Sequence, residues 1–208
     1  MNRKWLVGGV AAFLALAAVL ALVVGGVVGR SIVPAADAPT PPAAPEPEPE
    51  PAKPAGPVRF KDTLTDVSLA YPATWVRRMP ADQAVRLVAS SPDASAAVSV
   101  SVRRSDLETV TADTLAVVRP LTDDLLREDD RIGELPDPEQ VAVDGLPGYR
   151  YMYTYRDDDG GRGAHIHYFL FKGDRLIQIV LQAVPAAKLA ALQPTFDEIA
   201  RSFRKGPA

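Results

Sequence analysis

The chain has 208 residues and a formal net charge of −3, from 23 lysines and arginines against 26 acidic residues. This balance provides no strongly basic surface of the kind that nucleic acids require, so no nucleic-acid partner is expected. The sequence contains no cysteine, which excludes disulfides, thiolate nucleophiles, cysteine-based metal sites and the acylated cysteine of a bacterial lipoprotein.

The segment from Trp5 to Gly29 carries no charge and is flanked by Arg3, Lys4 and Arg30. As a helix it would span roughly 36 Å, enough to cross a hydrocarbon core of roughly 30 Å. Residues 5–29 therefore predict a transmembrane signal-anchor that contacts the lipid bilayer. The greater positive charge before it places residues 1–4 in the cytoplasm and the rest of the chain outside.

The alternative is a signal peptide that is cleaved after Ala38. The apolar run is longer than the usual core of 7 to 15 residues, and cleavage would leave Pro39 at the new terminus, so retention is favoured.

Residues 30–57 form a proline-rich linker with ten prolines between Pro34 and Pro57. Because proline fixes φ and removes a hydrogen-bond donor, this segment predicts a disordered or polyproline II stalk of up to roughly 70 Å. The remaining residues, 58–205, have the length of one ordinary domain.

Short apolar and polar alternations bounded by turn residues predict the strands of this domain. They cover residues 59–61, 67–71, 84–89, 97–102, 141–143, 149–156, 164–172 and 176–184. In the segment 98–102 the valines are expected to face the core and the serines to face outward. A turn is expected over residues 144–148.

Helical spacing of apolar residues predicts a helix over residues 111–129, capped by Thr111 or Asp113. Pro120 is expected to kink or split it, and its acidic end at residues 128–130 is expected to be solvated. A short helical piece near residues 188–192 and a closing helix over residues 194–203 complete the domain.

Together these elements predict an α+β fold, in which an antiparallel β-sheet of six to eight strands is flanked by helices. The domain is preceded by one transmembrane helix and the proline-rich linker.

The segment Val67 to Trp75, with Phe60 before it, resembles the opening signature of the PsbP-like α/β family. The segments 145–149 and 202–204 follow in the same order as in that family. The chain is also similar to extracytoplasmic proteins of actinobacteria of the LpqN/LpqT type. This resemblance covers nearly all of residues 58–205.

The resemblance implies an antiparallel sheet sandwiched between helices, in a family whose members are mainly non-catalytic and bind different partners. The chain differs from the lipoprotein branch because it lacks the lipid-bearing cysteine and has an apolar segment in its place.

The histidines His165 and His167 lie two residues apart in one predicted strand, so both point to the same face. If the hairpin closes symmetrically around Asp159, Tyr153 lies opposite His165 and Tyr151 opposite His167. These side chains and Tyr155 would then share one surface, whereas a shift of one residue would separate them. The alternative is that the aromatic rings simply pack under a helix.

A pair of histidines in this spacing could chelate zinc or copper only with a third ligand from Asp157, Asp158 or Asp159. No metal site, cofactor or catalytic residue is therefore expected, since no nucleophile elbow or phosphate-binding glycine loop occurs. Trp75 is expected to be a core or rim residue that could also line a ligand cleft.

The sequence thus favours a membrane-tethered, non-catalytic module that contacts an envelope protein or another envelope component. The alternative function is a sensor of a small ligand or metal that uses the tyrosine and histidine face. An open, concave pocket at this face would favour the alternative.

Overall fold

The computed structural model describes residues 56–206 except positions 106, 108 and 158. The expected transmembrane helix at residues 5–29 and most of the linker at residues 30–57 lie outside the described residues. Among the described residues, no helix is long and apolar enough to cross a membrane.

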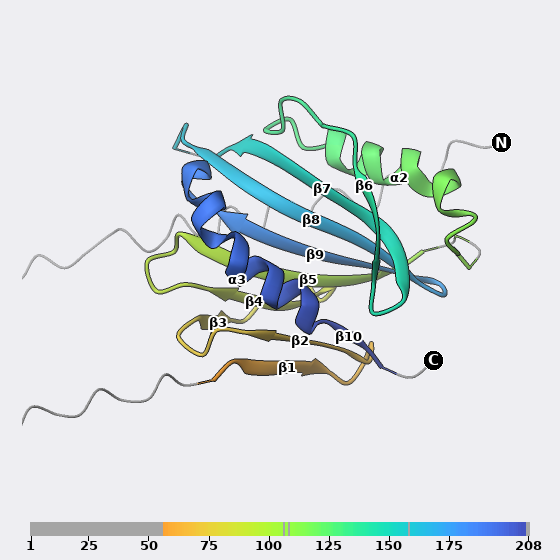
Figure 1. Ribbon diagram of the computed structural model, residues 1–208, viewed down its shortest axis with the longest axis horizontal. Helices are drawn as coiled ribbons and strands as arrows, with labels where there is room; N and C mark the ends of the chain where they lie inside the picture. Colours follow the sequence, from red (N-terminus) through yellow and green to blue (C-terminus); the bar gives the residue numbers. More distant parts are fainter. Residues whose placement is uncertain (1–55, 106, 108, 158, 207–208) are drawn as a thin grey trace, which may run out of the picture.

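The larger of two antiparallel sheets has seven strands in the order β3-β4-β5-β9-β8-β7-β6, within the expected range (Figure 1). Its strands are β3 (Val76–Arg78), β4 (Val85–Ser90), β5 (Ala96–Arg104), β9 (Arg175–Ala183), β8 (Arg162–Lys172), β7 (Leu146–Arg156) and β6 (Glu139–Val143). The short strand β3 was not expected, because three residues are too few to show an alternation.

A second, three-stranded sheet has the order β1-β2-β10. It consists of β1 (Val58–Asp62), β2 (Val67–Tyr71) and β10 (Arg204–Lys205). The sequence predicted the first two strands. The last one has only two residues, and it becomes a strand because it pairs with the start of β2.

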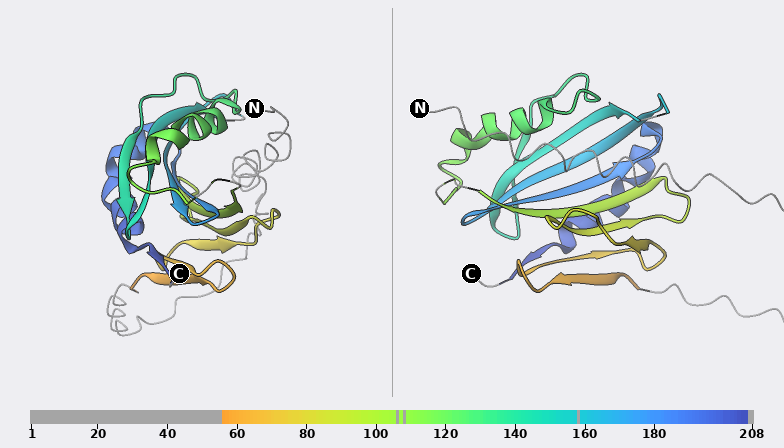
Figure 2. Two further views of the ribbon diagram at one scale, coloured as in Figure 1. Left: turned by 90° about the vertical axis from the view of Figure 1, so that its right-hand side faces the viewer. Right: turned by 180° about the vertical axis from the view of Figure 1, so that it is seen from behind.

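Helices α2 (Leu115–Arg127) and α3 (Leu189–Ser202) pack on opposite faces of the large sheet (Figures 1 and 2). A short 3-10 turn, η2 (Ala186–Lys188), leads into α3. Both helices continue through a proline, so α2 is not split at Pro120, and the short piece expected near residues 188–192 joins the closing helix through Pro194. Burial of an apolar side in each helix offsets the hydrogen bond that the proline removes.

The start of α2 also differs from the expectation. Its N-cap residue is Thr114, which makes no side-chain capping bond. The Thr114 hydroxyl instead accepts a hydrogen bond of 2.9 Å from the backbone N–H of Thr111. Thr111 therefore belongs to the preceding turn and not to the helix.

The expected turn at residues 144–148 is in fact a two-residue hairpin turn. Asp144 and Gly145 have φ values of 50° and 75°, and β7 begins directly after them. Gly148 lies within β7, where a Cβ atom would come within 2.1 Å of the carbonyl oxygen of Phe169. This glycine permits close strand contact and does not form a turn.

The two faces of the large sheet bury different sets of side chains. Alternate residues of β5, β8 and β9 form an apolar core with α3 and the small sheet, including Val98, Ile166 and Ile179. The opposite face packs α2 against β7 and β8. Ser99 lies on this second face, and it is buried although the sequence predicted that it points outward.

Candidate functional site

The four tyrosines of β7 and the two histidines of β8 share the face that carries α2. Tyr151 pairs with His167, and Tyr153 pairs with His165, as the symmetric hairpin predicted. Tyr149, Tyr151, Tyr153 and Tyr155 are all buried, and His167 is fully buried. The register therefore brings the five expected side chains of the candidate ligand face together.

The first two tyrosines of this row hold α2 in place. The Tyr149 hydroxyl donates to the carbonyl oxygen of Leu115 at 3.1 Å. The Tyr151 hydroxyl donates to Asp123 Oδ1 at 2.6 Å, and the Thr122 hydroxyl lies 2.6 Å from the same Tyr151 oxygen. Burial and the bond to the Asp123 carboxylate raise the pKa of Tyr151, so its hydroxyl remains a donor.

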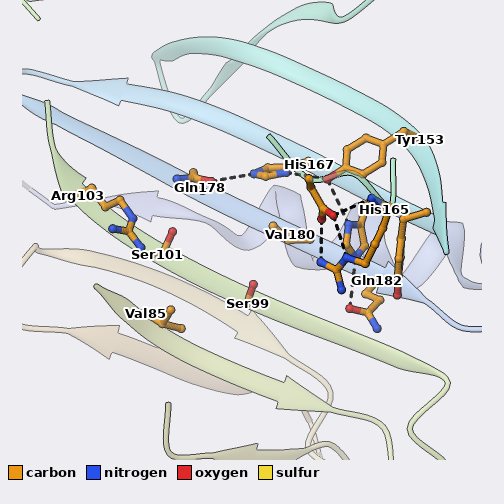
Figure 3. A pocket seen from close by; sticks show the side chains of 13 residues that line it. Val85, Ser99, Ser101, Arg103, Tyr153, His165, His167, Gln178, Val180 and Gln182 are labelled. Carbon is orange, nitrogen blue, oxygen red and sulfur yellow. Dashed lines mark hydrogen bonds and ion pairs between the residues drawn. The ribbon is translucent and has the colours of Figure 1, made fainter. Parts of the chain in front are cut away.

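Beyond α2, the same face contains a cavity of about 60 Å³, which we call the polar hollow (Figure 3). Its lining comes from five strands and from the segment after α2. The lining residues are Val85, Ser99, Ser101, Arg103, Asp129, Arg131, Tyr153, Tyr155, His165, His167, Gln178, Val180 and Gln182.

A chain of polar contacts at hydrogen-bond distance crosses the polar hollow from β9 to β7 and back. His167 Nε2 lies 3.1 Å from Gln178 Oε1, and His167 Nδ1 lies 3.1 Å from the Tyr153 hydroxyl. The same hydroxyl lies 3.2 Å from His165 Nδ1, and His165 Nε2 lies 3.2 Å from Gln182 Oε1. Tyr153 thus connects two imidazole–amide pairs.

The amide oxygens fix the tautomers of both imidazoles. An oxygen can only accept, so each Nε2 that faces a glutamine oxygen carries the proton. In a neutral imidazole the Nδ1 atom is then an acceptor. The Tyr153 hydroxyl has one proton and therefore donates to His165 or to His167, but not to both at once.

Burial keeps this network uncharged at neutral pH. It lowers the pKa of His165 to about 4 and the pKa of His167 to about 3, because desolvation disfavours the imidazolium. Desolvation also raises the pKa of Tyr153. The side chains are therefore weak bases and a weak acid, suited to hydrogen bonding and poorly suited to proton transfer.

Two arginines of this lining form ion pairs, Arg103 with Asp82 and Arg131 with Asp129. Arg131 donates to Asp129 through Nε at 2.8 Å and through Nη2 at 2.7 Å. Burial opposes ionisation of Asp129, but the hydrogen bonds and charge of Arg131 outweigh it and lower the pKa. The acidic end of α2 was expected to be solvated, yet the Asp129 side chain is only 11% exposed.

The ring of Tyr155 closes one side of the polar hollow. It lies 4.3 Å from the His165 ring, centroid to centroid, and the Arg131 guanidinium carbon lies 6.0 Å from its centroid. Gly163 stands opposite Tyr155 in β8, and a Cβ atom there would come within 2.3 Å of the tyrosine ring. The glycine thus leaves the space that this ring occupies.

Trp75 does not join this group. It packs against the apolar core on the face that carries α3, on the other side of the sheet. Within the described residues, no group of three or more His, Cys, Asp or Glu side chains is close enough to hold a metal ion. His165 and His167 instead direct their nitrogens at Tyr153 and at two different glutamines.

The sequence analysis missed the contributions of β5 and β9. Gln178 and Gln182 stand four residues apart in a strand that is otherwise almost entirely apolar, and both are buried. Two amides on one face of a buried strand need hydrogen-bond partners, which is the signal that could have identified them. Asp129 and Arg131 gave no comparable signal, because their place depends on how the segment after α2 folds back.

Comparisons with known proteins agree with this architecture. The solution structure of the cyanobacterial PsbP protein CyanoP from Synechocystis matches with a TM-score of 0.54 and 21% identity, covering 74% of this chain and 95% of that chain. A variant of the protein Mog1 matches with a TM-score of 0.51 and 11% identity, covering 74% and 98%. These likenesses show the fold alone.

LpqN of Mycobacterium tuberculosis, described as involved in cell envelope biogenesis, is more distant. It matches with a TM-score of 0.38 and 13% identity, covering 75% of this chain and 87% of that chain. A search of curated proteins found no match.

The sequence model of the PsbP family matches residues 55–205, nearly the whole of the described domain. The α+β architecture agrees with this match and confirms the resemblance that the sequence analysis identified. The chain belongs to the PsbP family.

Proposed function

We propose that this chain is a non-catalytic binding module that takes a small, uncharged polar group into the polar hollow. The observation that carries the proposal is the chain of polar contacts from Gln178 to Gln182 through His167, Tyr153 and His165, which lines a cavity and leaves one Tyr153–histidine contact without a proton at any moment. Buried polar side chains that converge on a cavity are typical of ligand sites.

The size and charge of the polar hollow limit the bound group. A cavity of about 60 Å³ holds a few water molecules or a group of similar size, and not a whole drug-sized ligand. Its imidazoles are neutral at physiological pH, and its two arginines are each paired with a carboxylate, Arg131 with Asp129 and Arg103 with Asp82. An amide or hydroxyl group at the end of a larger molecule fits these conditions best.

We propose further that residues 5–29 anchor the chain in the cytoplasmic membrane and that the domain lies outside the cytoplasm. The bound group then belongs to an envelope protein or another envelope component. The support is the uncharged segment between Lys4 and Arg30 and the excess of positive charge before it.

A broad apolar docking surface has less support. The described domain exposes large apolar side chains singly, on different elements, such as Leu64 at 73%, Met79 at 94% and Val117 at 78%. Scattered exposed side chains of this kind are ordinary on soluble surfaces. Recognition through the polar hollow is therefore preferred.

Thermal unfolding of the purified full-length chain tests the site. The probes are acetamide, glycerol and N-acetylglucosamine, which carry neutral amide or hydroxyl groups, and Zn²⁺ for the metal alternative. A ligand that binds only the folded state raises the melting temperature by mass action. We expect one or more neutral probes to stabilise the parent but not the double variant Gln178→Leu/Gln182→Leu.

The matched control is Gln193→Leu, because this glutamine lies in α3 and bonds to Asp197, away from the polar hollow. The control should respond to the probes as the parent does. Equal stabilisation of the parent and the double variant would contradict the proposal, as would no response to any neutral probe. Stabilisation by Zn²⁺ that is lost in His165→Ala/His167→Ala would instead favour a metal sensor.

The membrane anchor is tested separately by fractionation. The full chain should sediment with membranes, resist carbonate extraction and be accessible to protease added to spheroplasts. A mature protein that begins at Pro39 by mass spectrometry would refute the anchor and leave the proposal for the polar hollow intact.

A further inference from the structure

A second pocket lies between the small sheet and one end of the large sheet. It has a volume of about 220 Å³, and four of its seven lining residues are arginines. We call it the arginine pocket, lined by Leu64, Thr65, Arg86, Val102, Arg103, Arg104 and Arg175.

The β1–β2 turn closes this pocket against the large sheet. Arg175 Nη1 donates to the carbonyl oxygen of Leu64 at 3.4 Å. Arg86 Nε lies 3.5 Å from Asp62 Oδ2 and makes no hydrogen bond, although this nitrogen is buried. The pocket therefore lies where the small sheet meets the large sheet, and its lining comes from segments that are far apart in the sequence.

The strand register places like charges directly opposite one another at this end. Arg104 of β5 pairs with Arg175 of β9, and Lys172 of β8 pairs with the same Arg175. Three cationic residues thus stand in one row across three neighbouring strands. Like charges in directly opposite positions destabilise a sheet unless another group compensates them.

Of the described carboxylates, the one nearest Arg104 and Arg175 pairs with them only loosely. Asp174 lies 3.8 Å from Arg104 and 3.9 Å from Arg175, beyond hydrogen-bond distance from both. Asp82 accepts a 2.9 Å bond from Arg103. Asp62, which faces Arg86, also accepts from the Thr65 hydroxyl and the Leu64 backbone N–H.

Among the residues that the structure describes, four guanidinium groups therefore face three carboxylates, those of Asp62, Asp82 and Asp174. Two of these guanidiniums share the single, mostly exposed carboxylate of Asp174, whose side chain is 62% exposed. Exposed ion pairs at such distances contribute little stability. Arg104 and Arg175 can therefore turn their donors toward an incoming anion at small cost.

We propose that the arginine pocket binds a phosphate group, either free or as a phosphate ester. A guanidinium donates two parallel hydrogen bonds to phosphate oxygens, and a phosphate presents oxygens in several directions. Phosphate can therefore accept hydrogen bonds from several arginines that come from β4, β5 and β9. A planar carboxylate would be satisfied by a single bidentate arginine. The Thr65 hydroxyl adds a neutral polar group to the lining.

The test uses the full chain in phosphatidylcholine nanodiscs, titrated with inorganic phosphate by calorimetry at constant ionic strength set with chloride. The double variant Arg104→Gln/Arg175→Gln should lose about tenfold in phosphate affinity for each arginine removed. The control Arg201→Gln removes an exposed arginine of α3 outside the pocket and should bind phosphate within about twofold of the parent.

The double variant should remain folded, because it removes the repulsion between two cross-strand neighbours. Its melting temperature without phosphate should equal or exceed that of the parent. Equal phosphate affinity in the parent and the double variant would overturn the proposal.

A second arm identifies the source of the phosphate. Hydrogen exchange of the Leu64 and Thr65 amides is followed in nanodiscs with and without phosphatidylglycerol. Protection by phosphatidylglycerol alone assigns the site to a lipid headgroup, whereas protection only after inorganic phosphate is added assigns it to a soluble phosphate. No protection in either arm contradicts the proposal. The two cavities share one lining residue, Arg103, which the double variant leaves unchanged, so this outcome does not depend on the polar hollow.

Discussion

One face of the large sheet has two halves that use the same residue type for different purposes. In the half under α2, the Tyr149 and Tyr151 hydroxyls donate to a helix carbonyl and to a helix carboxylate. In the half with the polar hollow, the Tyr153 hydroxyl contacts two neutral imidazoles. Four tyrosines at alternate positions of β7 thus divide into a structural pair and a pair that lines a cavity.

The tyrosines of the two halves differ in role because their hydroxyl groups have different hydrogen-bond partners. A charged partner makes a hydrogen bond stronger and makes its loss more costly. Neutral partners beside a cavity can exchange a lost bond for a water molecule or for a bound group. Four changes test this contrast between the two halves, and they are described from the largest expected effect to the smallest.

Phe169 lies at the boundary between the halves, stacked 4.1 Å from the His167 ring and edge-on 5.6 Å from the Tyr151 ring. It is fully buried. Phe169→Ala should lower the free energy of unfolding by about 3 to 5 kcal/mol, through lost packing and a new cavity. Urea unfolding measures the loss. Met152→Ala, at a 42% exposed position of β7, is the control and should cost far less.

Acid should destabilise the half with the polar hollow first. Burial lowers the pKa of His165 to about 4 and of His167 to about 3, below the usual 6.5, so the unfolded chain binds more protons than the folded one as the pH falls below 6.5. Each histidine then removes about 1.4 kcal/mol of stability per pH unit, over a window from about 6.5 down to the folded pKa.

Urea unfolding at pH 6 and pH 5 measures this dependence. The double variant His165→Gln/His167→Gln should lose about 2 to 3 kcal/mol less than the parent between these two pH values. Equal slopes would show that carboxylates elsewhere cause the acid sensitivity and that the imidazoles are not buried in the neutral form.

The tyrosine pair gives the most direct comparison of the two halves. Tyr151→Phe removes a bond to a carboxylate and should cost about 1.5 to 3 kcal/mol, whereas Tyr153→Phe should cost about 1 kcal/mol or less. Chemical denaturation of both variants in parallel measures the difference. A larger loss for Tyr153→Phe would contradict the structural role that we assign to Tyr151.

Gly163→Ala should cost about 1 to 2 kcal/mol, because its Cβ atom would displace the Tyr155 ring that closes the polar hollow. The thermal midpoint reports this loss. Gly133→Ala is a suitable control, since a Cβ atom there meets nothing within 4 Å. An unchanged midpoint for Gly163→Ala would mean that the Tyr155 ring moves aside freely.

The sequence predicted the α+β class and most strands, because alternating apolar residues report directly on a half-buried strand. It also predicted the register of the tyrosines against the histidines, since the turn after β7 fixes the symmetry of the hairpin. The membrane anchor and the linker remain predictions.

Other features depend on tertiary contacts that no local pattern reports. Pro120 does not split α2 and α3 runs through Pro194, because burial of one helical side outweighs the loss of a single bond. The rule that serines face outward failed for Ser99, because the second face of the sheet is also buried at that point. Asp129 was misplaced for the same reason, as its surroundings come from segments far away in the sequence, whereas Trp75 packs at the rim of the apolar core as expected.

The pairing of β2 has a mechanical consequence. Val58, where the domain begins, lies opposite Tyr71 at one end of β2, whereas β10 pairs with Val67 and Ser68 at the other end. Force that enters the domain at Val58 is therefore borne first by β1, an edge strand held by five residue pairs to β2 alone. When the load runs along the strand it shears these pairs together, and when it runs across the sheet it opens them one after another. Resistance of the domain to pulling thus depends on the direction in which the preceding segment leaves Val58.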